Sequence, residues 1–179
     1  TRDSLSVIVE SISGKGGGET HFCRRAFFFF DTSDISIAPS EATLKVRGHN
    51  GNNSDVIAVR STASDPIVTG GFNDLHGASS AFASSDGSGA GTLAGVSGLT
   101  YSSEISTWST TGYNDIALNS TALDDMASLD DFKICIMDYD FDYLDITPSL
   151  GTFVRIGNYW SNNVGTSLDP YIDYTAGVA

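Results

Sequence analysis

Four consecutive phenylalanines, at positions 27–30, restrict the fold of this chain more than any other feature. Successive side chains of a β-strand point to opposite faces of its sheet, so an uninterrupted apolar run needs cover on both faces. A central strand of a two-layer β-sandwich meets this requirement, with Phe27 and Phe29 on one face and Phe28 and Phe30 on the other. We expect one pair to fill the core between the sheets. The other pair then lies under a loop or against a second subunit.

The rest of the chain has the pattern of an all-β protein. Short apolar alternations are separated by clusters of glycine, asparagine and aspartate, which is typical of half-buried strands joined by turns. The apolar run extends the aromatic strand over residues 20–31, and a further strand is predicted over residues 99–106. Residues 48–53, which are rich in glycine and asparagine, predict a turn.

One short helix is predicted over residues 120–129, because Asn119 or Ser120 is a favourable N-cap ahead of Leu123 and Met126. The length of 179 residues fits one domain. We therefore predict a single all-β domain over residues 1–179, an antiparallel β-sandwich of jelly-roll type with roughly eight to ten strands.

The charge balance excludes several classes of partner. The chain has nine Lys and Arg against 22 Asp and Glu, a net charge of −13. Nucleic acids and anionic membranes bind clustered cations, so neither is expected as a partner. No stretch approaches the roughly 20 apolar residues that a membrane span needs. An acidic surface poor in lysine suits a protein that works outside the cell.

No sequence motif indicates catalysis. His21, His49 and His76 have no Gly-x-Ser-x-Gly elbow nearby, and the chain has no His-Glu-x-x-His pair. Most of the acids fall in turns or on alternating faces, where solvation accounts for them. Cys23 and Cys135 lie in apolar strand-like runs, where a disulfide and two buried free thiols are both compatible with the sequence. We predict a protein that is not an enzyme and has no cofactor.

Asp138, Asp140 and Asp142 form a weak candidate for a Ca²⁺ site, because hard cations need several carboxylate oxygens that converge. The glycine turn and the closing glutamate of an EF-hand are missing, and alternate residues of an extended strand do not curl around an ion. The favoured interpretation is a solvated acidic face, with the aromatic residues between the aspartates packed inward.

Three motifs are similar to those of a known group of modules. The first is RAFFFFDTSDI from Arg25, followed by EATLKV from Glu41. The second is WSTTGYNDIALN from Trp108, and the third is GTSLDPYIDYT from Gly165. Together they resemble the DNRLRE-type β-sandwich domains and the similar terminal modules of tailed-phage structural proteins. These motifs identify a fold, and no chemistry is attached to them.

The resemblance implies a non-enzymatic virion structural protein of a tailed phage, either a capsid decoration (cement) subunit or a surface fibre module. Such a protein is located at the virion surface, with the major capsid protein or another virion protein as its partner, and we expect a homo-oligomer. The alternative is a carbohydrate-binding module of an extracellular or cell-surface protein. In that case Trp108 and Trp160 are the candidates for stacking on sugar rings.

Two segments are predicted to carry the attachment to a partner. One is an N-terminal arm over residues 1–12, whose alternation suits pairing with a neighbour's sheet edge. The other is the Gly/Ser/Ala-rich loop over residues 77–98, which is long for a simple connection. The competing interpretations are a first edge strand of the chain's own domain and a surface loop. The candidate contact residues are Leu5, Val7, Val9, Phe82 and Leu93.

Overall fold

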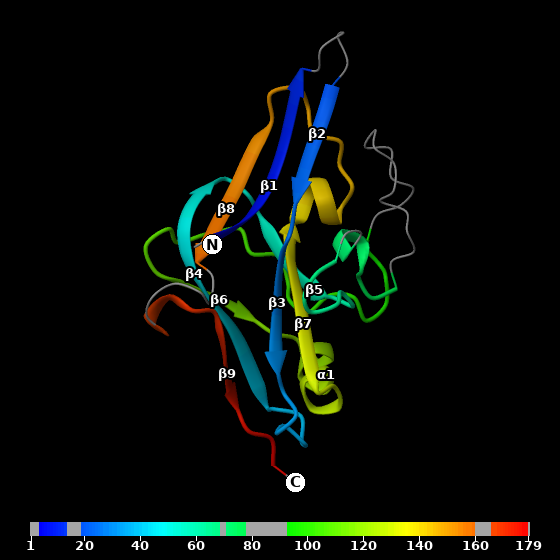
Figure 1. Cartoon of the computed structure of the whole chain (residues 1–179), viewed down its shortest axis with the longest axis vertical. Coiled ribbons are helices and arrows are strands. Elements are labelled where there is room, and N and C mark those ends of the chain that lie inside the picture. The colour runs from blue at the N-terminus through cyan, green and yellow to red at the C-terminus, as the bar shows by residue number, and fades with distance from the viewer. Residues whose placement is uncertain (1–3, 14–18, 69–70, 78–92, 160–165, 179) are drawn as a thin grey trace.

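Two antiparallel β-sheets pack face to face with one short α-helix beside them (Figure 1). The computed structural model describes residues 4–13, 19–68, 71–77, 93–159 and 166–178. Nine strands are present in these ranges, so the prediction of an all-β sandwich with one helix is confirmed. No helix among the described residues is long and apolar enough to cross a membrane.

The larger sheet has six strands. They are β1 (Ser4–Ser13), β2 (Glu19–Arg24), β4 (Glu41–Asn52), β6 (Tyr113–Ala117), β8 (Phe153–Tyr159) and β9 (Tyr171–Thr175). Their order is β2-β1-β8-β4-β6, and β9 also pairs with β4. The first part of the long strand β4 pairs with β9, where Lys45 is opposite Tyr171. Its second part pairs with β8, where Gly48 is opposite Asn158. The short 3₁₀ helix η3 (Thr166–Leu168) lies in the connection between β8 and β9.

The smaller sheet has three strands in the order β3-β7-β5. They are β3 (Ala26–Asp31), β5 (Val56–Arg60) and β7 (Asp131–Asp138). The central strand β7 pairs with β3 through Phe28 and Ile134, and with β5 through Val59 and Cys135. Because β7 is covered on both faces, its residues from Ile134 to Asp138 are all buried.

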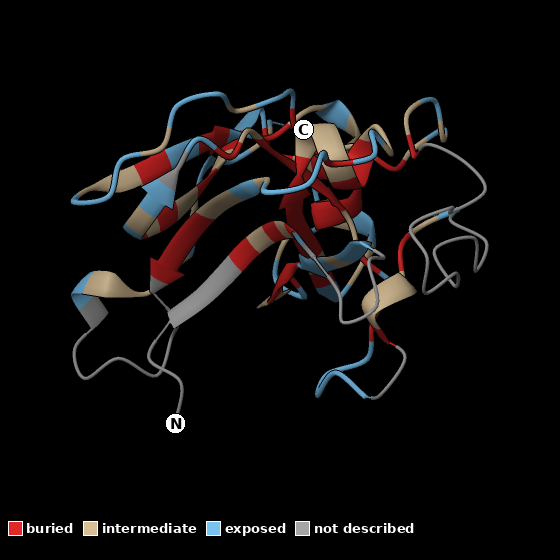
Figure 2. Cartoon of the chain, turned by 90° about the horizontal axis from the view of Figure 1, so that it is seen from above, coloured by how far each residue is buried: buried red, intermediate tan, exposed pale blue. Residues whose placement is uncertain are grey.

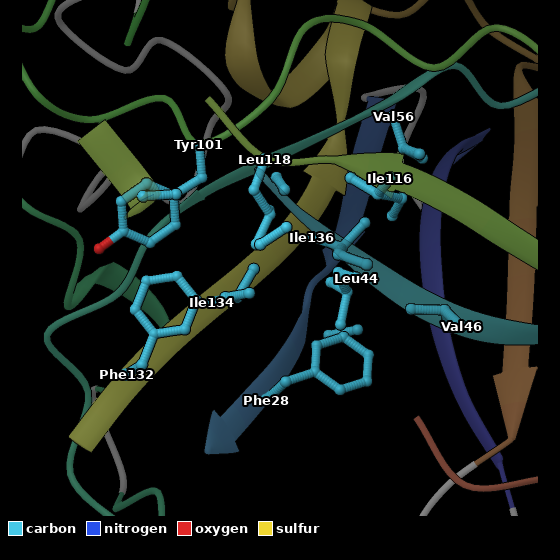
Figure 3. Packing of buried hydrophobic residues seen from close by; sticks show 14 of the residues in the cluster. Phe28, Leu44, Val46, Val56, Tyr101, Ile116, Leu118, Phe132, Ile134 and Ile136 are labelled. Carbon is cyan, nitrogen blue, oxygen red and sulfur yellow. The ribbon is translucent and has the colours of Figure 1, made fainter. Parts of the chain in front are cut away.

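The main core lies between the two sheets (Figure 3). It takes one face of each strand, for example Leu44 and Val46 from β4 and Ile134 and Ile136 from β7. Figure 2 shows the buried positions concentrated on the strands in the middle of the molecule. Phe28 belongs to this core and Phe30 packs against it, as the alternation of the phenylalanine run predicts.

A second apolar cluster covers the opposite face of the smaller sheet. Phe27 belongs to it and Phe29 packs against it. The cover comes from the chain's own loops, through residues such as Leu75 and Leu99, and from Tyr143 of the π-helical turn η2 (Tyr139–Tyr143). The prediction of cover on both faces is thus confirmed. A second subunit is not needed to hide the phenylalanines, so this reason for expecting an oligomer is wrong.

The aromatic strand predicted over residues 20–31 is broken at Arg25. β2 ends at Arg24 in the larger sheet, and β3 begins at Ala26 in the smaller one. The Arg25 side chain turns into the interior, and the residue is only 7% exposed. A single residue therefore carries the chain from one sheet to the other.

The guanidinium of Arg25 is held by several groups. Its Nε and Nη2 donate to the two carboxylate oxygens of Asp142, at 2.8 and 2.6 Å. Its Nη1 donates to the Phe72 carbonyl oxygen at 2.6 Å, and its Cζ lies 4.0 Å from the centre of the Phe72 ring. This bidentate pair joins the point where the chain changes sheet to η2 and to the 3₁₀ turn η1 (Gly71–Asn73).

The helix α1 (Ser120–Ser128) forms where it is predicted. The Asn119 side chain caps it by accepting from the Ala122 amide at 3.1 Å. Met126 is buried in the main core. Asp125 faces inward, accepts from the Tyr101 hydroxyl at 2.7 Å and pairs with Arg60 at 3.0 Å.

Three local predictions are wrong. Residues 99–106 bend and form no strand; their β-pairing with β5 consists of isolated bridges at Thr100 and Ile105. β4 runs on to Asn52, so most of the turn predicted over residues 48–53 is strand. β1 lies between β2 and β8 as an internal strand, so its residues form neither a free arm nor an edge strand.

We predict that Arg25→Ala lowers the free energy of unfolding by about 3–5 kcal/mol, because it leaves the Asp142 carboxylate buried without its cation. The neighbouring exposed Arg24→Ala is the matched control, with an expected change within about 0.5 kcal/mol. Urea unfolding of both variants measures the difference. Equal effects of the two substitutions would contradict the importance of the buried pair.

Candidate binding site around Trp108

Trp108 lies on the segment that leads from Ile105 into β6, and its ring is half-buried. One side of the residue packs against the main core. The indole Nε1 donates to the carbonyl oxygen of Gly157 on β8, at 3.3 Å. These two contacts hold the indole in place while part of it remains open to solvent.

Asn114 fixes the backbone that follows Trp108. Its Oδ1 accepts from the Ser109 amide at 2.6 Å, and its Nδ2 donates to the Ser109 carbonyl oxygen at 3.0 Å and to the Val46 carbonyl oxygen at 3.3 Å. The Ser109 hydroxyl in turn accepts from the Gly112 amide at 3.0 Å. The buried amide of Asn114 therefore ties the Trp108 segment to β4, which gives the WSTTGYN motif a structural role.

Gly48 lets this segment approach the larger sheet closely. A side chain at Gly48 would collide with the Ser109 carbonyl oxygen, and one at Gly157 would collide with the Asn50 side chain. A Cβ at Gly51 would lie 3.5 Å from both Trp108 and Thr110, which is ordinary contact. The composition of residues 48–53 predicts a turn, whereas the function of Gly48 here is to leave room for the Ser109 backbone.

Two hollows open beside Trp108. The first has a volume of about 240 Å³ and is lined by Gly51, Asn53, Ser54, Ser106, Trp108, Thr110 and Ile156. The second has a volume of about 500 Å³ and is lined by Ile105, Thr107, Trp108, Ser109, Tyr113, Asn114 and Asp115. Trp108 is common to both linings. We refer to them below as the first and the second hollow.

The linings are rich in hydroxyl and amide groups and poor in charge. Among the described residues, none that lines the first hollow has an ionisable acid or base. In the second hollow Asp115 is the charged side chain, and it pairs with Lys45 at 2.7 Å. The Tyr113 ring at this hollow is also fixed, because its hydroxyl donates to the carbonyl oxygens of Ser167 and Asp169 at 3.0 and 3.1 Å. Such sites suit a neutral polar ligand.

The acidic segment at residues 138–142 does not have the predicted arrangement. Asp138 ends β7 and caps η2, while Asp140 and Asp142 lie within that π-helical turn. Asp138 and Asp142 are buried, at 1% and 2% exposure, and Asp142 is committed to Arg25. The predicted solvated acidic face is therefore wrong, and so is the alternating geometry behind the calcium candidate. Within the described ranges, no group of three or more His, Cys, Asp or Glu side chains is placed to hold a metal ion.

Asp138 is a buried carboxylate with two hydrogen bonds. Its Oδ1 accepts from the Phe141 amide at 2.8 Å, and its Oδ2 accepts from the Ser54 hydroxyl at 2.8 Å. Burial raises the pKa of Asp138 from 3.8 to about 6, and the two hydrogen bonds offset only part of that rise. Ser54 also lines the first hollow, so this contact fixes the direction in which its hydroxyl donates.

The two predicted tryptophan candidates have different outcomes. Trp108 is placed at the two hollows, whereas Trp160 lies outside the described residues. The stacking role of Trp108 stays a prediction. Asn114, Gly48 and Gly157 were missed by sequence reasoning, because a buried asparagine and a glycine at a close approach have no periodic signal.

Three of the predicted contact residues are not presented on the surface. Val7 belongs to the main core, Val9 is also buried, and Leu93 belongs to the second cluster. The contact hypothesis for these three side chains is therefore wrong, because each is covered by its own domain. Phe82 lies outside the described residues, and so does the side chain of Leu5.

Both cysteines are free thiols in this structure, with Cys23 exposed and Cys135 buried. The sequence left a disulfide and two buried free thiols open; the structure has free thiols, but of the two only Cys135 is buried. Burial raises the pKa of the Cys135 thiol well above its ordinary value, so this side chain behaves as a small apolar residue.

Comparison with known proteins adds no identity to this geometry. No family model matches the chain, and neither a curated protein nor a solved structure matches it. The resemblance to DNRLRE-type and phage-terminal modules stays a prediction.

We predict that Asp138→Asn makes the chain more stable than the wild type above pH 6 and less dependent on pH. Because the folded chain binds this proton more tightly than the unfolded chain, wild-type stability falls as the pH rises from about 4 to about 6. The difference should reach roughly 2–3 kcal/mol, since one pKa unit corresponds to about 1.4 kcal/mol. An asparagine can keep both contacts, through Oδ1 to the Phe141 amide and through Nδ2 to the Ser54 hydroxyl oxygen.

Urea unfolding at acidic and neutral pH measures this effect. The matched control is Asp140→Asn, which makes the same change in net charge in the adjacent turn. The same pH dependence in both variants and in the wild type would show that Asp138 is not the group responsible.

Proposed function

We propose that this chain is a non-enzymatic structural module of a virion surface, a decoration subunit or part of a surface fibre. We further propose that it packs against a neighbouring virion protein through the outer face of β2, β1 and β8. The observation that carries this proposal is an exposed apolar surface on that face, toward the end where β1 and β2 are connected. Ile12, Phe22 and Phe153 are 41%, 46% and 40% exposed there.

The strand registers place these residues together. Val7 and Ile156 are opposite each other and point into the main core, so the alternate residues of β1 and β8 point outward. Glu10 is opposite both Phe22 and Phe153, which sets the two phenylalanines on either side of it in one row across three strands. Ile12 lies one row further along β1.

The next row of the outer face contains Ile8 between two arginines, since Ile8 is opposite both Arg24 and Arg155. The Arg155 guanidinium lies 5.4 Å from the centre of the Phe153 ring. Aromatic residues and arginine are enriched in the centres of protein interfaces. This face has two cations and one acid in the two rows, in a chain with a net charge of −13. It is thus the kind of surface that attracts another protein with similar acidic character.

The rigid construction of the module supports the same function. Both faces of the smaller sheet are sealed by the chain itself, in the main core and in the second cluster. The outer face of the larger sheet, in contrast, keeps exposed apolar groups that are available for assembly. A sandwich of this kind acts as a spacer that holds its contact surface in a fixed geometry.

We predict that the double variant Phe22→Ser, Phe153→Ser loses association with its partner but keeps its fold, with a free energy of unfolding within about 1 kcal/mol of the wild type. The two rings are half-exposed, so removing them costs the isolated domain little. The matched control is Tyr174→Ser, which changes an equally exposed aromatic residue on β9. Sedimentation velocity measures self-association, and co-sedimentation with purified particles measures binding to a virion.

A photo-crosslinking residue at position 22, with a second one at position 174 as the control, identifies the partner. We expect adducts from position 22 with a virion protein or with a second copy of the chain. Particles that lack the chain, or equal crosslinking from both positions, would contradict the proposal.

A further inference from the structure

We propose that the two hollows around Trp108 form a binding site for a neutral oligosaccharide, with the indole as its stacking platform. This site is separate from the outer face of β2, β1 and β8. It would add recognition of a glycan to a module that is otherwise structural.

The platform is rigid before any ligand arrives. The indole is tied to β8 through Gly157, and the backbone next to it is tied to β4 through Asn114. A ligand therefore does not have to order this ring on binding, which lowers the entropic cost of the complex. One face of a pyranose ring presents C–H groups with a slight positive charge, and the negative face of an aromatic ring attracts such groups.

The first hollow offers the polar groups that sugar hydroxyls need. Ser106 and Thr110 have exposed hydroxyls, and Asn53 has an exposed amide. Hydroxyl and amide groups both donate and accept hydrogen bonds, as sugar hydroxyls do. Ser54 has a more specific role, because its hydroxyl hydrogen is committed to Asp138. Its oxygen is left as an acceptor toward the hollow, which favours a ligand that donates at this point.

The second hollow extends the site along a chain of sugar units. It shares Trp108 with the first hollow and adds the ring of Tyr113 and the hydroxyls of Thr107 and Ser109. The Asp115 carboxylate can accept hydrogen bonds from ligand hydroxyls. A linear oligosaccharide that crosses the indole reaches both hollows, whereas a monosaccharide fills only one.

Charge determines the class of sugar. The described lining of the first hollow has no cation to pair with a sulfate or a carboxylate, and the whole chain has a net charge of −13. Anionic polysaccharides are therefore repelled. An apolar ligand would leave the hydroxyls and the Asn53 amide of this lining without partners, which is costly. A neutral glycan satisfies both constraints.

The test is affinity electrophoresis of the full chain in gels that contain a neutral β-glucan, a galactomannan or a xylan. An alginate gel, which is anionic, serves as the charge control. We expect at least one neutral polymer to retard the wild-type chain and alginate not to do so. The variants Trp108→Ala and Gly51→Val should each bind about tenfold more weakly, the loss expected for roughly one stacking contact.

The Gly51→Val variant keeps the test decisive if Trp108→Ala fails to fold. A Cβ at Gly51 lies in ordinary contact with Trp108 and Thr110, so a valine is expected to be accepted there and to add bulk at the first hollow, which Gly51 lines. Tyr174→Ala is the matched control, because this exposed aromatic residue lines a different hollow with Asp34 and Ala176. Its binding should equal that of the wild type, and thermal unfolding should confirm the fold of every variant.

Three outcomes overturn the proposal: no retardation by any neutral polymer, retardation by alginate alone, or unchanged binding by a folded Gly51→Val variant. None of these measurements involves the outer face of β2, β1 and β8. Failure here therefore leaves the assembly function as it stands, and failure of assembly leaves the glycan site as it stands.

Discussion

The buried ion pair between Arg25 and Asp142 is the contact on which the arrangement of the two sheets depends. The chain passes from the larger to the smaller sheet at this one arginine. Its guanidinium joins segments that are 47 and 117 residues away along the sequence. Burying either charge without its partner costs free energy, so the pair is stable in the interior only when both charges and their hydrogen bonds are present. An apolar pair could match its stability, but it would not impose the bidentate geometry that fixes the position of η2.

The position of η2 in turn completes the second cluster. Tyr143 belongs to this cluster, and Tyr139 and Leu144 pack against it, so the turn that holds Asp142 also covers Phe27. A three-stranded sheet with one bare apolar face would be prone to association. The ion pair therefore has an effect beyond its own energy. It places the cover that makes the smaller sheet self-contained, which leaves assembly to the larger sheet.

Periodic features of the fold could be predicted from the sequence, while features that depend on distant partners could not. The faces of the phenylalanine run follow from alternation alone, and the start of α1 follows from Asn119 as its cap. By contrast, nothing local distinguishes Arg25 from Arg24, because burial of an arginine depends on a carboxylate 117 residues away. The prediction of a solvated acidic face at residues 138–142 was wrong for the same reason. Its alternation suggested a strand, but its burial is determined by Arg25 and Ser54.

The candidate site shows the same division. Trp108 is a candidate from its residue type alone, whereas no local pattern indicates the side chains and backbone that support it. Gly48 had the composition of a turn residue, and only the fold reveals that the Ser109 backbone occupies the space that its missing side chain leaves. Asn114 had the parity of an inward-facing strand residue, where an apolar side chain is the usual expectation. Support of this kind is assembled from β4, β6 and β8, which are far apart in sequence.

The two proposed surfaces are compatible because they use opposite faces of β8. Ile156 points inward and lines the first hollow, whereas Phe153 lies three residues away and points outward. An odd spacing along a strand places side chains on opposite faces. A neighbour that packs on the outer face of β2, β1 and β8 therefore covers Phe153 without covering the lining at Ile156. Gly157 connects the two, since it belongs to the outward set of β8 but offers its carbonyl oxygen to Trp108. The larger sheet thus separates the outer face, which is suited to packing against another protein, from the two hollows around Trp108, which are suited to binding a glycan. Strand β8 supplies residues to both.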